Sequence, residues 1–418
     1  MTPDGGESVE PESGRTEAAS QATGALAGLR VIDLSRVLAG PLAAQMLGDH
    51  GADVVKVESP IGDETRRWGP PFLDAEQDAI VSGYYYGLNR NKRNIVLDLQ
   101  TSAGRRVMLD LIGTADVVIE NFKPGTMEKW GVSYDAVLSQ RHRGLVYCRI
   151  SGYGADGPLG GLPGYDAALQ AYGGLMSVNG EPDGEPLRVG VPIVDMTAGN
   201  LAFSGILLAL LERASSGLGQ LVDITLLDAV VSILHPHSAS FSMTGRSPRR
   251  TGIAHPHVAP YQVFPTADGG RLFIAAASDQ QFANLVDVLG RPELALDIRF
   301  RSNQSRVENI VVLQEILFDA LSSWNAHSLA QHLTERGVPS SPVNDVGTAL
   351  RSGQVAHREM FVDQPHYRGV GVPIKLSRSG SVPPREPALP GADTDQVLSE
   401  IGYDQQTIVE LREAGVLG

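Results

Sequence analysis

Asp195 is the residue whose type and surroundings most directly suggest chemistry. It lies in the segment GVPIVDMTAG (190–199), where an apolar run ends and a long apolar helix is predicted to begin. This position makes Asp195 a candidate helix N-cap, which is a purely structural role. The helix dipole and free amides would also keep its carboxylate ionised, and a glycine in the first turn would let a bulky substrate approach. An ionised, accessible aspartate can be a nucleophile, so both roles stay open on local sequence alone.

Basic and amide side chains gather in the turns that follow predicted strands in the first half of the chain. In an open α/β sheet, ligands bind at the carboxyl ends of the strands. Several cations at that edge of an otherwise acidic protein indicate an anionic ligand with phosphates, and the alternative is scattered, solvated charge. The side chains concerned are Arg36, Arg66, Arg67, Asn91, Lys92, Arg93, Asn121, Lys123 and Lys129.

Three other kinds of site are not supported by their motifs. Residues 152–157 match G-x-G-x-x-G, but the prolines and glycines that follow prevent the helix that a dinucleotide site needs, so we interpret 152–164 as an active-site lid. Two His-Pro-His triplets, 235–237 and 255–257, have no third ligand nearby, and we predict no metal site. The G-x-S-x-G motif of serine hydrolases does not occur.

Composition narrows the classes of partner and the compartment. The formal charge of -14 argues against nucleic acid and membrane surfaces as partners, since both are anionic. The uncharged stretch 199–211 is shorter than the roughly 20 residues that span a bilayer, and predicts a buried helix. A single cysteine, Cys148 in a predicted core strand, fits a reducing, cytoplasmic environment.

The order of apolar patterns predicts an α/β protein with more than one domain. Residues 1–27 are poor in large apolar side chains and predict a disordered tail. Strands are predicted at 29–35, 52–58, 94–99, 116–122 and 144–151, with helices between them, which is typical of an open parallel sheet. Helical patterns follow over 195–214 and 223–234. A hairpin at 259–277 with its turn at 267–270, and helices at 279–289 and 306–336, predict a smaller α+β domain.

Six motifs, in this order, resemble the class III CoA-transferases, the formyl-CoA and carnitine-CoA transferase type. They are LRVIDLSRVLAGPLAAQMLGDHGADVVKVE (29–58), GDETRRWGPPF (62–72), NRNKRNIVLDL (89–99), ADVVIENFKPG (115–125), ISGYGADGPLGGLPGYDAALQAYGGLMS (150–177) and the GxxxxDxxxG around Asp195. The resemblance extends from residue 27 to the C-terminus. It implies a Rossmann-like large domain formed by both chain ends, with a small α+β domain inserted, and an interlocked homodimer. The implied parts are 28–226 (large domain), 227–250 (linker), 251–345 (small domain) and 346–418 (linker and return to the large domain).

The resemblance also implies a reaction and its residues. Asp195 matches the family nucleophile, which forms a mixed anhydride and then an aspartyl-CoA thioester while the 152–164 loop keeps water out. No tightly bound cofactor is implied, because coenzyme A and acyl-CoA are substrates, with free carboxylic acids as partners. The positions that match the family's CoA pocket are Val37, Leu38, Lys92, Arg93, Asn121, Lys129 and Trp130.

Departures from the family pattern bear on the substrate. The formyl-type enzymes have glutamine where Leu38 stands, and a tetraglycine loop with no counterpart here, which argues against formate and oxalate. The segments TGIAHPHVAPYQVF (251–264) and ASDQQF (277–282) are closer to the dicarboxylate branch, which includes succinate–glutarate-type transferases. We expect Arg36 to hold the distal carboxylate of such an acid, and Tyr165 to contact substrate as well.

Two alternative functions share the fold. An α-methylacyl-CoA racemase of this family uses the histidine of a Gly-His-Asp triplet, and Gly164-Tyr165-Asp166 stands in its place here. A phenol with an ordinary pKa near 10 is a poor substitute base. The second alternative is a CoA-binding protein without catalysis, against which the acid at position 195 argues.

Overall fold

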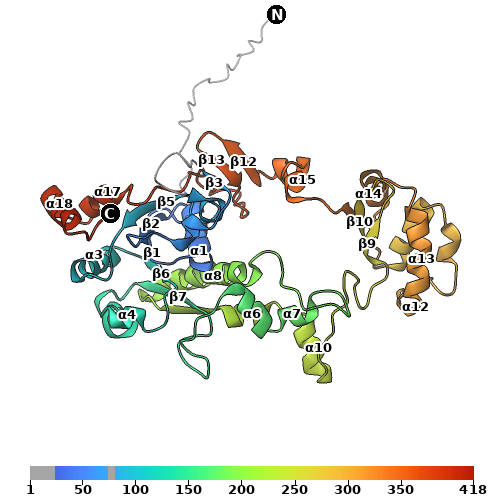
Figure 1. The fold of residues 1–418 in the computed structure, drawn as a ribbon, viewed down its shortest axis with the longest axis horizontal. Coiled ribbons are helices and arrows are strands. Elements are labelled where there is room, and N and C mark those ends of the chain that lie inside the picture. The colour runs from blue at the N-terminus through green and yellow to red at the C-terminus, as the bar shows by residue number, and fades with distance from the viewer. Residues whose placement is uncertain (1–23, 74–80) are drawn as a thin grey trace, which may run out of the picture.

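A six-stranded parallel sheet forms the centre of the molecule (Figure 1). The structure, a computed structural model, describes residues 24–73 and 81–418. The strand order is β5-β2-β1-β6-β7-β8, and every neighbouring pair is parallel. The predicted mixed α/β fold with a parallel sheet is thus confirmed. The strands are β1 (Arg30–Asp33), β2 (Asp53–Glu58), β5 (Lys92–Val96), β6 (Val117–Glu120), β7 (Val146–Ser151) and β8 (Leu221–Thr225).

The sixth strand, β8, corrects our expectation of a helix over 223–234. Its last residue, Thr225, is also the N-cap of α9 (Leu226–Ser232), and the Thr225 hydroxyl accepts the amide of Asp228. Strand and helix therefore follow one another without a loop. Because apolar residues recur throughout both elements, their boundary is hidden in the residue pattern.

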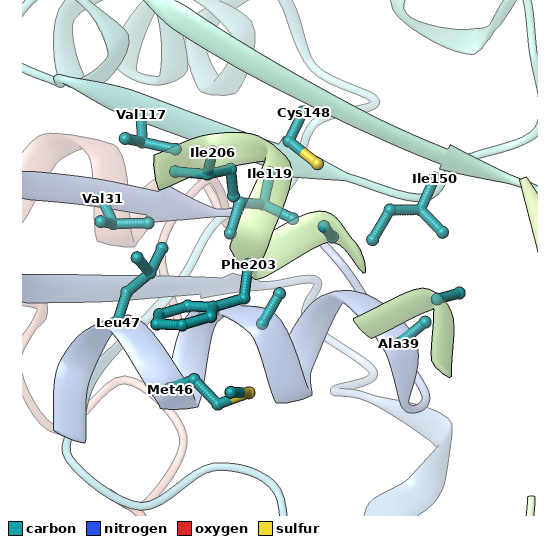
Figure 2. Close-up of a cluster of buried hydrophobic side chains, with 14 of the residues drawn as sticks. Val31, Ala39, Met46, Leu47, Val117, Ile119, Cys148, Ile150, Phe203 and Ile206 are labelled. Carbon is teal, nitrogen blue, oxygen red and sulfur yellow. The ribbon is translucent and has the colours of Figure 1, made fainter. Parts of the chain in front are cut away.

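One face of the sheet is covered by α1 (Ala39–Asp49) and α8 (Ile193–Ser216), which pack on each other. Figure 2 shows this core, with Phe203 and Ile206 of α8 beside strand residues such as Ile119. Cys148 is fully buried in the same cluster, which confirms its prediction as a core residue. Buried parallel strands read as near-continuous apolar runs, and this made them visible in the sequence.

The opposite face is covered by α3 (Ser102–Ile112) and by the end of the chain. Val397 of α17 (Thr394–Glu400) and Ile408 of α18 (Gln405–Glu413) are fully buried there, and Leu417 bridges to Leu97. Both chain ends thus contribute to one sheet-centred body.

A separate lobe lies at the far right of Figure 1 and has its own hydrophobic cluster. Its antiparallel sheet has the order β11-β10-β9, with the predicted hairpin turn at 267–270 between β9 and β10. The helix expected over 306–336 is three helices, with breaks at Asn309 and before the N-cap Asn325. The elements are β9 (Tyr261–Pro265), β10 (Arg271–Ala275), α11 (Asp279–Val288), a 3-10 turn (Pro292–Ala295), α12 (Asn303–Glu308), α13 (Ile310–Leu321), α14 (Ala326–Glu335) and β11 (Ser340–Pro342).

Short elements connect these parts of the chain. Those in the first half of the chain are a 3-10 turn (Glu64–Arg67), β3 (Phe72–Leu73), β4 (Val81–Ser82), α2 (Gly83–Tyr86), α4 (Thr126–Lys129), a π turn (Tyr134–Leu138), α5 (Ser139–Arg141), α6 (Asp166–Tyr172) and α7 (Leu175–Val178). Those flanking the separate lobe are α10 (His237–Thr244), α15 (Val346–Leu350), α16 (Gly353–His357), β12 (Phe361–Gln364) and β13 (Tyr367–Val370).

The predicted tail needs one correction. Residues 1–23 lie outside the described residues, but 24–27 form a turn against the large body. The amide of Leu26 donates to the carbonyl of His50 (2.8 Å), and its side chain packs on the core. The expectation of disorder is therefore wrong for 24–27, because one leucine there reaches an apolar partner.

Helix α8 is long and apolar enough, by length and composition alone, to cross a membrane. In this fold one side of it packs in the core. The prediction of a buried helix over 199–211 holds for that side only, because Leu208 and Leu211 on the other side are exposed. Val194, Ala198, Ala202 and Ile206, spaced four residues apart, are fully buried against α1 and the sheet. Its first turn carries Asp195, so the same helix packs the core and presents the candidate nucleophile.

Candidate active site

A pocket of about 220 Å³ lies at the carboxyl edge of the parallel sheet. It opens beside the ends of β1 and β6, which are neighbours in the middle of the sheet. From β1 the chain adds β2 and β5 on one side, and it then crosses to the other side to add β6, β7 and β8. Such switch points are where open α/β sheets bind ligands. The pocket brings together Arg36, Val37, Leu38, Asn121, Tyr165 and Asp195, all of which were predicted as site residues.

Asp195 is the third residue of α8, not its N-cap as predicted. The N-cap is Pro192, whose side chain cannot accept the free amides of the first turn. Gly199, one turn further on, lies against the start of α1, where an added Cβ would be 2.8 Å from the carbonyl oxygen of Ala39. The absence of a side chain at Gly199 therefore lets α8 bring Asp195 to the turn after β1.

Asp166 supplies the cap that Pro192 cannot. Its Oδ2 accepts the backbone amides of Val194 (2.8 Å) and Asp195 (3.2 Å). Its Oδ1 accepts from Nε2 of the buried Gln170 (2.6 Å). Sequence reasoning did not choose Asp166 as a site residue. The available signal was the triplet Gly164-Tyr165-Asp166, because its last residue matches the aspartate of the Gly-His-Asp triplet. Only the central Tyr165 entered the prediction.

The electrostatics of Asp195 differ from the expectation that the helix dipole keeps it ionised. Burial, and after it the charge of the nearby Asp166, raise the pKa of Asp195 to about 7. The physical reason is that the Asp166 carboxylate already occupies the helix amides. Asp195 is therefore a half-buried acid poised near neutrality, which is the range in which catalytic carboxyl groups are effective.

The turn after β1 is held in an unusual conformation. Val37 has φ 70°, which is strained for a β-branched residue. The Asn121 side chain bonds to both sides of the neighbouring Arg36, because its Oδ1 accepts the Arg36 amide (2.8 Å) and its Nδ2 donates to the Arg36 carbonyl (2.7 Å). The Val37 amide donates to Asp63 Oδ2 (3.3 Å). Asn121 thus shapes the pocket wall that faces Asp195.

A second pocket of about 550 Å³ adjoins the first along the sheet edge and shares Arg36, Phe122 and Lys123 with it. The Arg36 guanidinium lies 5.6 Å from the Phe122 ring centre, and Phe122 packs edge-on against Trp130 (5.2 Å). Apolar walls with cations at the junction suit an elongated ligand that has a flat ring and anionic groups. Of the residues predicted for the CoA pocket, Trp130 lines this second pocket.

The structure does not bring Lys92, Arg93 or Lys129 to either pocket. Strand β5 begins at Lys92, two residues earlier than predicted, so Lys92 and Arg93 lie within the strand instead of in a turn. Lys92 is buried, and its Nζ donates to Asp33 (2.9 Å) as well as to two other oxygens. Arg93 pairs with Asp53 and Glu400, and Lys129 is exposed at the end of α4.

The 152–164 loop, interpreted as a lid, contributes Gly152 and residues 162–164 to the pocket. Its two ends touch, since a Cβ on Gly152 would lie 2.7 Å from the amide nitrogen of Gly164. The loop is therefore closed at its base, and Tyr165 follows at the pocket wall. Within residues 24–73 and 81–418, the structure groups no three His, Cys, Asp or Glu side chains that could hold a metal ion.

Comparison with known proteins identifies the family. The profile of CoA-transferase family III matches residues 26–394. The succinate–glutarate CoA-transferase of Agrobacterium fabrum is 40% identical over 389 residues, which cover 91% of this chain and 97% of that protein. The succinyl-CoA:glutarate CoA-transferase of Homo sapiens is 35% identical over 399 residues (94% and 90%). The crystal structure of a CAIB/BAIF family protein from Brucella suis superposes with TM-score 0.84 at 39% identity, covering 91% of this chain and 100% of that one. The chain belongs to CoA-transferase family III, and it is a CoA-transferase.

Proposed function

We propose that the chain moves CoA from a dicarboxylyl-CoA, such as succinyl-CoA, to a free carboxylic acid through covalent intermediates on Asp195. The observation that carries the proposal is the position of Asp195 in the first turn of α8, facing the pocket where β1 and β6 end. A carboxylate that titrates near neutrality is available as a nucleophile at physiological pH.

The reaction proceeds in two symmetric halves. The Asp195 carboxylate attacks the thioester carbonyl and the C–S bond breaks. CoA departs as the thiolate, and a mixed anhydride of Asp195 and the first acid remains. The thiolate then attacks the Asp195 carbonyl carbon, which forms an aspartyl-CoA thioester and releases the first acid. The acceptor carboxylate attacks this thioester, and the thiolate returns to the acceptor's carbonyl. The 152–164 loop supports this route because Gly152 and residues 162–164 line the pocket, where they would limit the access of water.

The second pocket supports a position for CoA. The adenine and phosphates would occupy the wall formed by Trp130, Phe122 and the cation Lys123. The thioester end would then reach Asp195 through the junction of the two pockets, where Arg36 and Lys123 line both. Val37, Leu38 and Asn121 line the first pocket and stay predicted CoA contacts.

The substrate class rests on the relatives and on Arg36. Several relatives are named for succinate or succinyl-CoA, among them those from Agrobacterium fabrum, Homo sapiens, Haloarcula hispanica and Chloroflexus aurantiacus. Arg36 lines the same pocket as Asp195, and a guanidinium can hold a carboxylate by two parallel hydrogen bonds. Tyr165, which directly follows the 152–164 loop and lines the same pocket, stays a predicted substrate contact.

The assembly we propose is an interlocked homodimer. Leu208 and Leu211, on the outward side of α8, are 68% and 70% exposed, and Leu201 lies on the same side. A second copy of the chain would cover this apolar face, as the family resemblance implies. The cytoplasmic location stays a prediction.

One experiment tests the reaction. Purified protein is given succinyl-CoA with labelled glutarate, and glutaryl-CoA is measured for the wild type, Asp195→Ala and the exposed control Asp183→Asn. We expect transfer by the wild type and the control, and a loss of at least about a thousandfold in Asp195→Ala, because the covalent route is closed. Full activity in Asp195→Ala would disprove the mechanism.

A further inference from the structure

Two carboxylates share the first turn of α8. Asp195 belongs to the turn, and Asp166 reaches it from α6 and accepts two of its amides, one of them the amide of Asp195 itself. Asp166 is buried, whereas Asp195 faces the pocket. The pair therefore places one carboxylate permanently next to the one that reacts.

We propose that Asp166 is a positioning residue that favours the CoA-bearing state of Asp195 over the free carboxylate. The inference rests on the proposed function and deepens it. It goes beyond the identity of the nucleophile, because it assigns to a second residue control over how much of the chain carries CoA at equilibrium.

The charge balance of the half-reaction gives the physical reason. Free Asp195 carries a negative charge next to Asp166. In the aspartyl-CoA thioester its side chain is neutral, because the C–S bond has replaced one carboxylate oxygen, and that oxygen and the negative charge leave together with the released acid. Like charges in a half-buried site repel one another, so Asp166 destabilises the reactant state of Asp195 and not the thioester.

Protonation of Asp195 reports the same repulsion, since protonation and conversion to the thioester both remove its charge. Burial is the larger cause of the raised pKa of Asp195, and the charge of Asp166 is the second. Asp195 and Asp166 in turn raise the pKa of Tyr84, which burial already raises, to about 12. The other charged or titratable groups that line the pocket with Asp195 are Arg36, Glu64, Lys123 and Tyr165.

The surroundings prevent Asp166 from moving away from this repulsion. Gln170 is fully buried, donates to Asp166 Oδ1 (2.6 Å), and accepts the amide of Val189 through its own Oε1 (2.8 Å). Val189 lies in the segment that leads into α8. Both oxygens of Asp166 are thus engaged, and the spacing of the two carboxylates is set by the fold.

The test measures the fraction of chain that carries CoA by intact-protein mass spectrometry. Wild type, Asp166→Asn, Asp166→Ser, Asp166→Glu and the exposed control Asp183→Asn are equilibrated at pH 8 with one fixed ratio of succinyl-CoA to succinate. Asp166→Asn and Asp166→Ser are neutral, and both keep a side-chain oxygen that can cap the helix. If one of them fails to fold, the other still provides the test. We expect their ratio of CoA-bearing to free chain to fall about tenfold, the equivalent of one pKa unit. Asp166→Glu and Asp183→Asn should stay near the wild-type ratio.

A second readout separates this role from simple helix capping. The pH midpoint for the rate of adduct formation should fall by about one unit in the neutral variants and not in Asp166→Glu. An unchanged ratio and midpoint in a folded neutral variant would overturn the inference and leave the proposed function intact. A wild-type chain that never carries CoA would instead overturn the proposed function, and this inference with it.

Discussion

Gly199 of α8 packs directly on the backbone of Ala39 at the start of α1. A Cβ on Gly199 would lie 2.8 Å from the Ala39 carbonyl oxygen and 3.2 Å from the Leu42 Cβ. Since Asp195 is one turn before Gly199 and Ala39 directly follows the strained turn at Val37, this contact sets the distance between the candidate nucleophile and the opposite pocket wall.

Gly199→Ala should therefore impair activity more than it impairs folding. The added methyl must push α8 away from a carbonyl that cannot yield, and we expect kcat/KM to fall at least about tenfold while stability falls by about 1–3 kcal/mol. Steady-state kinetics and chemical denaturation measure the two effects. Gly353→Ala is the matched control, because an added Cβ there meets open space. Wild-type kcat/KM in Gly199→Ala would contradict this account of the contact.

The raised pKa of Asp195 predicts that the nucleophile reduces stability. Its folded pKa of about 7 lies above its ordinary value of 3.8, so the folded state binds its proton more tightly than the unfolded state. The destabilisation grows as the pH rises from about 4 to about 7, and is complete above that. Asp195→Asn should accordingly be more stable than the wild type at pH 8 by up to about 4 kcal/mol, since the shift is about 3 pKa units, with the difference shrinking toward pH 4.

Denaturant unfolding of both proteins across that pH range measures the effect, and kcat/KM of the wild type should rise as the pH passes about 7. An Asp195→Asn variant less stable than the wild type at pH 8 would show that the carboxylate is stabilised in the folded protein instead.

Arg36→Ala should discriminate between acids by their second carboxylate. Loss of the guanidinium should raise KM for glutarate or succinate about tenfold to a hundredfold, because a charge-assisted hydrogen bond contributes about 1.5–3 kcal/mol. A monocarboxylic acid should be affected much less. Arg67→Ala, the removal of an exposed arginine outside both pockets, is the control. Equal increases in KM for mono- and dicarboxylic acids would show that Arg36 does not bind the distal carboxylate.

Lys92 should prove structural. It is buried with Asp33, and Lys92→Met removes the ion-pair partner of that carboxylate and leaves only the nearby Lys56 charge, which should cost about 3 kcal/mol of stability. KM for acyl-CoA should change little in the protein that stays folded. Lys375→Met is the control, because it removes only a weak ion pair with the exposed Glu359. It should leave the unfolding midpoint near that of the wild type. A large rise in the KM for acyl-CoA without loss of stability would show that Lys92 contacts CoA after all.

The errors of the sequence-based predictions have a common physical cause, which is contact between residues distant in the chain. The parallel strands were visible because burial on both faces produces continuous apolar runs. The start of α8 was misplaced by three residues because its cap comes from Asp166, which lies 28 residues before Val194. Lys92 is basic and follows a turn, yet its partner Asp33 is 59 residues away. Residue types indicated the chemistry, but pairing across the sheet decided which charges face the ligand.

The apolar outward side of α8 gives the last prediction. Leu208→Glu places a charge in the middle of the surface that we propose a second copy covers, and burial of an unpaired carboxylate is unfavourable by several kcal/mol. Light scattering should give twice the chain mass of 44.5 kDa for the wild type and a shift toward that single mass for Leu208→Glu. Leu296→Glu, at an 86% exposed position of the separate lobe, is the control. A Leu208→Glu protein that keeps the wild-type mass would show that this side of α8 is not the interface.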